Sequence, residues 1–146
     1  MRRYVFVFAS VCAVLTGCKP FGSQVLTACE DAIKQRLRSP TSYDRVSLRE
    51  TEEQISRRED VVFKFRRQGY SAEETAVFMK EVDAAPEKVT LYAKTIEYDA
   101  KNAFGAPLRN RTTCEYFTID GKEDAALASN VTLDGKSLAE WSASGG

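Results

Sequence analysis

Four cysteines hold most of the reactive chemistry of this sequence, which has no histidine. Cys12 lies inside an uncharged apolar run, Cys18 follows that run, and Cys29 and Cys114 lie in the remaining chain. A cysteine can act as a nucleophile, bind a metal or form a disulfide. Because histidine is absent, Ser-His-Asp and Cys-His catalytic arrangements and histidine-containing zinc sites are excluded.

The sequence contains no motif that is typical of a cofactor or metal site. It contains no C-x-x-C pair, no G-x-x-x-x-G-K-[ST] loop and no G-x-G-x-x-G loop, so the redox and phosphate-binding sites that use these motifs are not expected. Two cysteines beyond the N-terminal region are too few for a cysteine-rich metal site. We therefore expect no cofactor and no metal.

Three carboxylates remain as candidates for catalysis: Glu97, Asp99 and Glu115, which fall on or beside two expected strands. A pair of carboxyl groups can hydrolyse a glycosidic bond. Such work requires a shifted pKa in a cleft, whereas charged residues on a solvent-facing strand explain these three more simply. We expect no enzyme activity, and a carboxylate-dependent cell-wall glycosidase is the least favoured alternative.

Residues 1–17 have the composition of a secretory signal peptide. Arg2 and Arg3 precede an uncharged run over residues 4–15, which two small residues follow. A spanning helix needs about 20 apolar residues. The run is shorter than that, and Lys19-Pro20 block its extension. The pattern favours an exported protein over one with a membrane-spanning helix.

The segment Leu15-Thr16-Gly17-Cys18 resembles the lipobox of bacterial lipoproteins. The resemblance implies that Cys18 takes a diacylglyceryl group, that residues 1–17 are cleaved off, and that fatty chains such as palmitate hold the protein on a membrane. Each buried methylene contributes about 0.8 kcal/mol to such anchoring. In lipoproteins of Gram-negative bacteria, Asp after the cysteine commonly retains the protein in the inner membrane. Lys19 stands there, so the outer membrane, facing the periplasm, is expected.

The sequence predicts an α+β fold, in which an N-terminal helix packs on a small antiparallel sheet of three or four strands. We expect residues 18–24 to form a tether, residues 25–141 a single domain, and residues 142–146 a frayed Ser/Gly tail. Predicted strands cover residues 43–49, 88–98, 112–119 and 131–133.

The N-terminal helix presents one apolar stripe. Leu26, Cys29 and Ile33 recur at spacings of three and four, and Ser39-Pro40 ends the helix. Cys29 therefore points into the core, towards the strand that contains Cys114. In an oxidising compartment such a pair most often forms a disulfide. We predict that this bond joins the helix to the sheet.

A helical hairpin is predicted between the first two strands, over residues 51–84. Its first helix covers about residues 51–68, and Ser71 with Glu74 forms a capping box at the start of its second. Val61, Phe63 and Phe65 also alternate as in a strand, which is the alternative. The hairpin carries more apolar area than two short helices can hide from each other. We expect a partner surface on it, formed by Val61, Phe63, Phe65, Phe78 and Met79.

The segment from Tyr98 to Tyr116 resembles small exported bacterial proteins with a Y-x-A-x-N-x-F-G-A…R…C-x-Y pattern. This resemblance implies the fold and export, and it implies no activity. Two interpretations of the long turn expected over residues 99–111 stay open. Phe104 fills the core while Gly105 supplies an unusual backbone angle. Alternatively, Asn102, Phe104, Gly105 and Arg109 form a recognition loop.

Charge excludes one class of partner. The 21 basic and 21 acidic residues balance, so no general attraction to nucleic acid is expected. The expected function is therefore a non-catalytic protein-interaction module that is anchored to a membrane by lipid and binds an envelope protein. The alternative is an inhibitor of a host hydrolase that attacks the cell wall, as some small envelope lipoproteins are.

Overall fold

The computed structural model describes residues 23–145. The predicted signal peptide at residues 1–17, the predicted lipidation residue Cys18 and residues 19–22 of the predicted tether lie outside the described residues. The elements, in chain order, are α1 (Gln24–Arg36), the short 3-10 helix η1 (Pro40–Ser42), β1 (Asp44–Gln54), α2 (Arg58–Arg67), α3 (Ala72–Ala84), the 3-10 helix η2 (Pro86–Lys88), β2 (Thr90–Lys101), β3 (Pro107–Thr118), β4 (Thr132–Leu133) and α4 (Leu138–Ala143). The predicted α+β class is confirmed.

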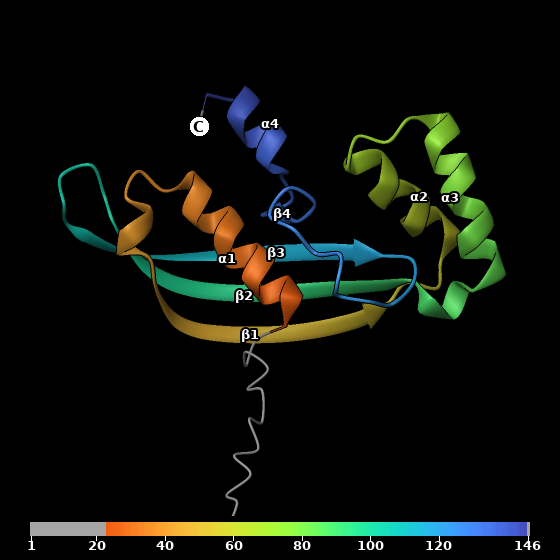
Figure 1. The fold of residues 1–146 in the computed structure, drawn as a ribbon, viewed down its shortest axis with the longest axis horizontal. Coiled ribbons are helices and arrows are strands. Elements are labelled where there is room, and N and C mark those ends of the chain that lie inside the picture. The colour runs from red at the N-terminus through yellow and green to blue at the C-terminus, as the bar shows by residue number, and fades with distance from the viewer. Residues whose placement is uncertain (1–22, 146) are drawn as a thin grey trace, which may run out of the picture.

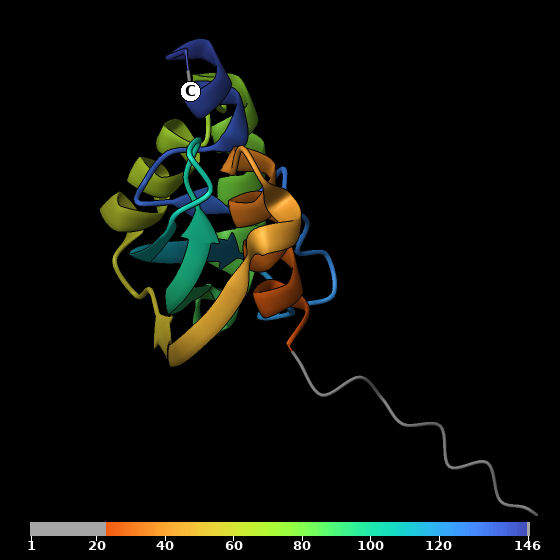
Figure 2. The ribbon, with the colours of Figure 1, turned by 90° about the vertical axis from the view of Figure 1, so that its left-hand side faces the viewer.

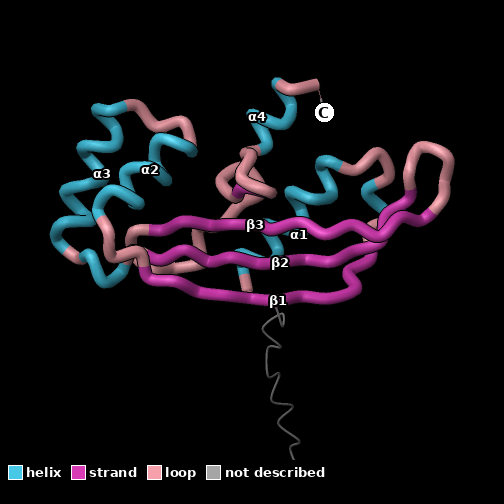
Figure 3. Tube along the Cα trace, turned by 180° about the vertical axis from the view of Figure 1, so that it is seen from behind, coloured by secondary structure: helices cyan, strands magenta, loops and turns pink. Residues whose placement is uncertain are grey.

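The four strands form one antiparallel sheet in the order β1-β2-β3-β4 (Figures 1 and 3). Its register pairs Leu91 with Phe117 and Tyr92 with Tyr116. Because successive side chains point to opposite faces of a strand, the two pairs lie on opposite faces. Tyr92 and Tyr116 join a core with α1, whereas Leu91 and Phe117 join a core with α2 and α3. Figure 2 shows α1 and α2 on different sides of the strands.

α1 is bounded by local hydrogen bonds. The Ser23 hydroxyl accepts a hydrogen bond from the backbone N–H of Leu26, which satisfies one of the unpaired amides at a helix start. Gln24 therefore belongs to the helix and not to the tether, where we expected it. The helix ends at Arg36, ahead of Ser39-Pro40.

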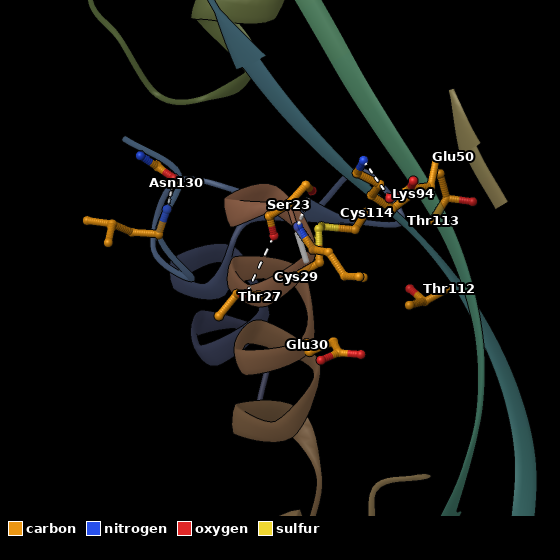
Figure 4. Close-up of a disulfide and its surroundings, with 12 residues drawn as sticks. Ser23, Thr27, Cys29, Glu30, Glu50, Lys94, Thr112, Thr113, Cys114 and Asn130 are labelled. Carbon is orange, nitrogen blue, oxygen red and sulfur yellow. Dashed lines mark hydrogen bonds and ion pairs between the residues drawn. A yellow bond between two sulfur atoms is a disulfide. The ribbon is translucent and has the colours of Figure 1, made fainter. Parts of the chain in front are cut away.

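The predicted disulfide is confirmed. Cys29 and Cys114 are bonded, with their Cα atoms 5.9 Å apart, and both are fully buried. Figure 4 shows the bond running from α1 to β3. Cys29 lies on the buried stripe of α1 with Leu26 and Ile33. The bond therefore joins helix to sheet within the core, as the periodicity of the helix predicted.

The helical hairpin is present but begins later than predicted. Residues 51–54 belong to β1, whose pairing with β2 runs on to Gln54 opposite Thr90. The strand forms here because residues 51–54 are all polar and offer no apolar stripe that a helix could bury. Val61 and Phe65, four residues apart, share the buried face of α2. Their alternation with Phe63 therefore does not make a strand.

Two further boundaries differ from the prediction. The long turn expected over residues 99–111 is short, because β2 continues to Lys101 and β3 begins at Pro107. At the C-terminal end, α4 reaches Ala143 and so includes residues 142–143, which we expected in the frayed tail; a capping box of Ser137 and Glu140 starts it. Within residues 23–145, none of the helices has the length and apolar content that crossing a bilayer requires.

Candidate functional site

The tip of the β2–β3 hairpin, residues 102–106, is built around one carboxamide. Asn102 Oδ1 accepts hydrogen bonds from the backbone N–H groups of Phe104, at 2.9 Å, and Ala106, at 3.0 Å. The Asn102 N–H donates to the Ala106 carbonyl at 2.9 Å, and the Gly105 N–H donates to the Asn102 carbonyl at 3.0 Å. These four bonds give the tip a defined shape, as asparagine does in many turns.

Position 105 requires glycine because of its backbone angle φ, and not because a side chain would lack space. Its φ is +80°, and a Cβ atom added there would meet no atom within 4 Å. That region of φ is unfavourable for residues with a side chain. The predicted special angle at Gly105 is thus confirmed.

Phe104 stands at the tip with 94% of its surface exposed. The expectation that this ring fills the core is wrong, because the hairpin extends past the C-terminal end of α1 and none of the α-helices in residues 23–145 covers its tip (Figures 1 and 3). Leu108, two residues beyond the tip on β3, is half exposed as well. The end of the hairpin therefore presents apolar side chains on a rigid turn.

Arg109 links the two strands of the hairpin next to its tip. Its Nε and Nη2 donate to Asp99 Oδ1 and Oδ2 at 2.7 and 2.9 Å, across the pair of strands. These hydrogen bonds lower the pKa of Asp99 and raise that of Arg109. On the β2 side, the backbone N–H of Lys101 donates to Ser42 Oγ at 2.9 Å. The structure thus brings Asn102, Phe104, Gly105 and Arg109 together in one hairpin end.

Comparison with known proteins gives no information about this site. No family model, curated protein or solved structure matches the chain. The function of the tip must therefore be argued from its own geometry.

The partner surface predicted on the helical hairpin is wrong as a set. Val61, Phe65 and Met79 are buried and Phe78 is half-buried. The prediction considered only the apolar area that the two helices bury against each other. In the structure, α2 and α3 also bury apolar area against the sheet, where they pack with Val89 and Phe117. Phe63 alone of the five residues is mostly exposed, at 60%.

The three candidate carboxylates lie on the sheet face opposite α1, each beside a cation. Glu115 accepts from Lys64 Nζ at 2.8 Å. Glu97 lies 3.4 Å from Arg111 Nη2 and also accepts from the Ser47 hydroxyl. Asp99 is held by Arg109, which lowers its pKa, and a general acid needs the opposite shift. These contacts favour a structural role. Across residues 23–145, no group of three potential metal-ligating side chains occurs.

One ion pair, formed by a buried lysine and a half-exposed glutamate, was missed by the sequence analysis. Lys94 is 4% exposed, and its Nζ lies 2.8 Å from Glu50 Oε1 (Figure 4). Both residues are on the face that α1 covers, near the disulfide. The sequence could have indicated that Lys94 is buried, because it lies two residues from both Tyr92 and Ile96 and so shares their face of β2.

Proposed function

We propose that this protein is a non-catalytic, lipid-anchored envelope lipoprotein that binds a protein partner through the tip of the β2–β3 hairpin. The observation that carries the proposal is the exposure of Phe104 on a turn that Asn102 holds rigidly. Aromatic residues are enriched at protein interfaces. A preorganised loop also loses little conformational entropy when it binds.

The position of the proposed anchor supports this role. From Cys18 to Ser23 the chain can reach at most about 18 Å, so the N-terminal end of α1 lies close to the bilayer. The tip lies beyond the other end of this helix, next to η1 (Figure 1). Because α1 has 13 residues, its two ends are about 20 Å apart. The tip is thus presented away from the point of attachment.

The export signal and the lipobox carry the localisation part of the proposal. The disulfide supports export, because such bonds persist in oxidising compartments. Lys19 after the lipidated cysteine favours the outer membrane, with the domain facing the periplasm. Replacement of Cys18 by serine tests this part: we expect the uncleaved precursor to accumulate and the lipid mass to be lost. Unchanged mass and membrane association would contradict lipidation.

The partner is tested by photocrosslinking in cells. A benzoylphenylalanine at position 104 is compared with one at position 63, since Phe104 and Phe63 are both exposed and lie on different elements. We expect one adduct of defined mass from position 104 only. Excess unlabelled wild-type protein should abolish the adduct, and excess Phe104→Ala variant should not. Equal adducts from both positions, or none from position 104, would overturn the proposal.

Inhibition of a cell-wall hydrolase is the second candidate, and the same projecting tip favours it. A rigid loop with an exposed aromatic side chain can enter an enzyme cleft, as loops of protein inhibitors do. The test is the rate of lysis of cell-wall substrate by lysozyme with increasing protein. Inhibition that Phe104→Ala removes would select this candidate, and an unchanged rate would eliminate it for lysozyme.

A further inference from the structure

Two adjoining hollows lie between the turn that joins α2 to α3 and the chain that follows β3. Their volumes are about 190 Å³ and 100 Å³, and both are lined by Gln68, Tyr70 and Asn130. Together they form what we call the aromatic cleft. It is separate from the hairpin tip, since none of residues 102–109 lines it.

The floor of the aromatic cleft is a cluster of rings. Phe65 stacks on Phe78, with 5.0 Å between ring centroids, and meets Tyr70 and Phe117 edge to face at 5.6 and 5.2 Å. Tyr70 also meets Phe78 edge to face at 5.1 Å. Phe65 and Phe117 are buried, whereas Phe78 is half-buried and Tyr70 is exposed. Tyr70 and Phe78 therefore offer ring surface to a ligand.

Two neutral polar side chains line the cleft beside these rings. The Gln68 carboxamide and the Tyr70 hydroxyl have no hydrogen-bond partner among residues 23–145. The turn that holds them is tight: Gly69 has a φ of +92°, and the Tyr70 N–H donates to the Phe65 carbonyl at 3.2 Å. The turn thus fixes the backbone from which these two side chains reach the cleft, and the fold does not use their polar groups.

Charge is missing from the cleft. Among the described residues, those that line it include no Asp, Glu, Lys or Arg, although these types make up 29% of the chain. Charged side chains line an adjoining hollow, where Lys64 pairs with Glu115 and Arg67 donates to the Gly135 carbonyl. A charged ligand in the cleft would therefore lose hydration and meet only charges that are already engaged. An acyl chain would cover Gln68 and Tyr70 and leave their polar groups unpaired. The ligand that fits is neutral, with an apolar face and several hydroxyl groups.

We propose that the aromatic cleft binds one ring of a neutral carbohydrate. The C–H face of a sugar ring packs on the electron-rich face of an aromatic ring, here Tyr70 or Phe78. The hydroxyl groups at its edge exchange hydrogen bonds with the Gln68 carboxamide and the Tyr70 hydroxyl. A concave, mainly apolar site with a few placed polar groups is the usual form of a small-ligand site.

The test is a titration of the intact, isotope-labelled protein, kept in micelles of a detergent that has no sugar head group. The probes are tri-N-acetylchitotriose and maltotriose, and charged trigalacturonate is the control. Amide chemical shifts are followed. We expect saturable shifts at Gln68 and Tyr70 with a neutral trisaccharide, and none with trigalacturonate.

Three variants make the test specific. Gln68→Ala and Tyr70→Phe each remove one hydrogen-bonding group, so each should weaken binding about fivefold; Tyr70→Phe keeps the ring that packs on Phe65. Phe63→Ala changes an exposed ring on the same helical hairpin and should have no effect. The proposal is overturned by an absence of saturable shifts with both neutral sugars, or by affinity that both cleft variants leave unchanged. Tighter binding of a neutral tripeptide than of either sugar would also overturn it and assign the cleft to peptides.

Discussion

The side chain of Asn102 holds the backbone of Phe104, since Asn102 Oδ1 accepts the Phe104 N–H at 2.9 Å. Loss of this acceptor in Asn102→Ala should free the amides of Phe104 and Ala106. We expect hydrogen exchange at both amides to become about tenfold faster, because a loss of about 1.4 kcal/mol of local stability corresponds to a tenfold change in the opening equilibrium. Asn102→Asp keeps an acceptor oxygen and is the control. Unchanged exchange in Asn102→Ala would show that the turn forms without the side chain.

The exposed ring of Phe104 should contribute almost nothing to folding. We expect Phe104→Ala to change the free energy of unfolding in urea by less than about 0.5 kcal/mol. Phe65→Ala is the matched variant with a buried ring, and it should cost about 3 to 5 kcal/mol. A large loss of stability in Phe104→Ala would place that ring in the core after all.

Reduction of the disulfide should destabilise the fold strongly. The Cys29–Cys114 bond closes a loop of 85 residues, which in the chain-entropy account stabilises by about 4 to 5 kcal/mol. Urea denaturation with and without a reducing agent measures the difference. Intact mass after alkylation of the non-reduced protein should show neither Cys29 nor Cys114 modified, and two modified thiols would contradict the bond.

The ion pair of the buried Lys94 with the half-exposed Glu50 should stabilise the fold less than its geometry suggests. Burial of an ammonium group is costly, so a buried pair is often replaced by an apolar residue without loss. We expect Lys94→Met to be neutral or stabilising. Glu50→Ala leaves the Lys94 ammonium unpaired and should cost about 1 to 3 kcal/mol. Adding Lys94→Met to Glu50→Ala should restore stability, and a larger loss from Lys94→Met alone would reverse this ranking.

The capping box of α3 should make stability depend on pH in acid. The pKa of Glu74 is lowered from its ordinary value of 4.5, first because the Ser71 backbone N–H donates to it and then because of the Ser71 hydroxyl. A carboxyl that is more acidic in the folded state stabilises the fold above pH 4.5, and this contribution is lost as pH falls through its lower folded pKa.

This pH effect can be isolated with a substitution that does not titrate. Glu74→Gln retains a side chain that can complete a capping box but removes the charge. We expect the wild-type Tm to exceed that of Glu74→Gln at pH 7 and the two values to converge in acid. Glu53→Gln, on the exposed strand β1, is the control. A constant Tm difference at all pH values would contradict the expected linkage.

Several features were predictable from short stretches of sequence. The stripe of Leu26, Cys29 and Ile33 identified the buried face of α1, and with it the side of the helix on which the disulfide forms. Ser71 and Glu74 marked the start of α3. Such features depend on residues within one or two helical turns, whose spacing is visible in the sequence.

Other features depended on which surfaces meet. The periodicity of β2 shows that its two faces differ, but not which helix covers which face. The structure places Tyr92, Lys94 and Ile96 under α1, and Leu91 under the helical hairpin. For the same reason Phe65 and Phe104, two similar side chains in the sequence, end in opposite environments.

The sequence by itself determined the α+β class, the pairing of Cys29 with Cys114 and the presence of a special turn at Gly105. It also contains the segment Leu15-Thr16-Gly17-Cys18, whose resemblance to a lipobox supports the proposed anchoring. The tertiary structure alone decided that Phe104 is exposed, that Val61, Phe65 and Met79 of the helical hairpin are buried, and that Gln68 and Tyr70 border a cleft without charge. The physical reason is that backbone conformation responds to neighbours in the chain, whereas burial is decided by contacts between residues far apart in it.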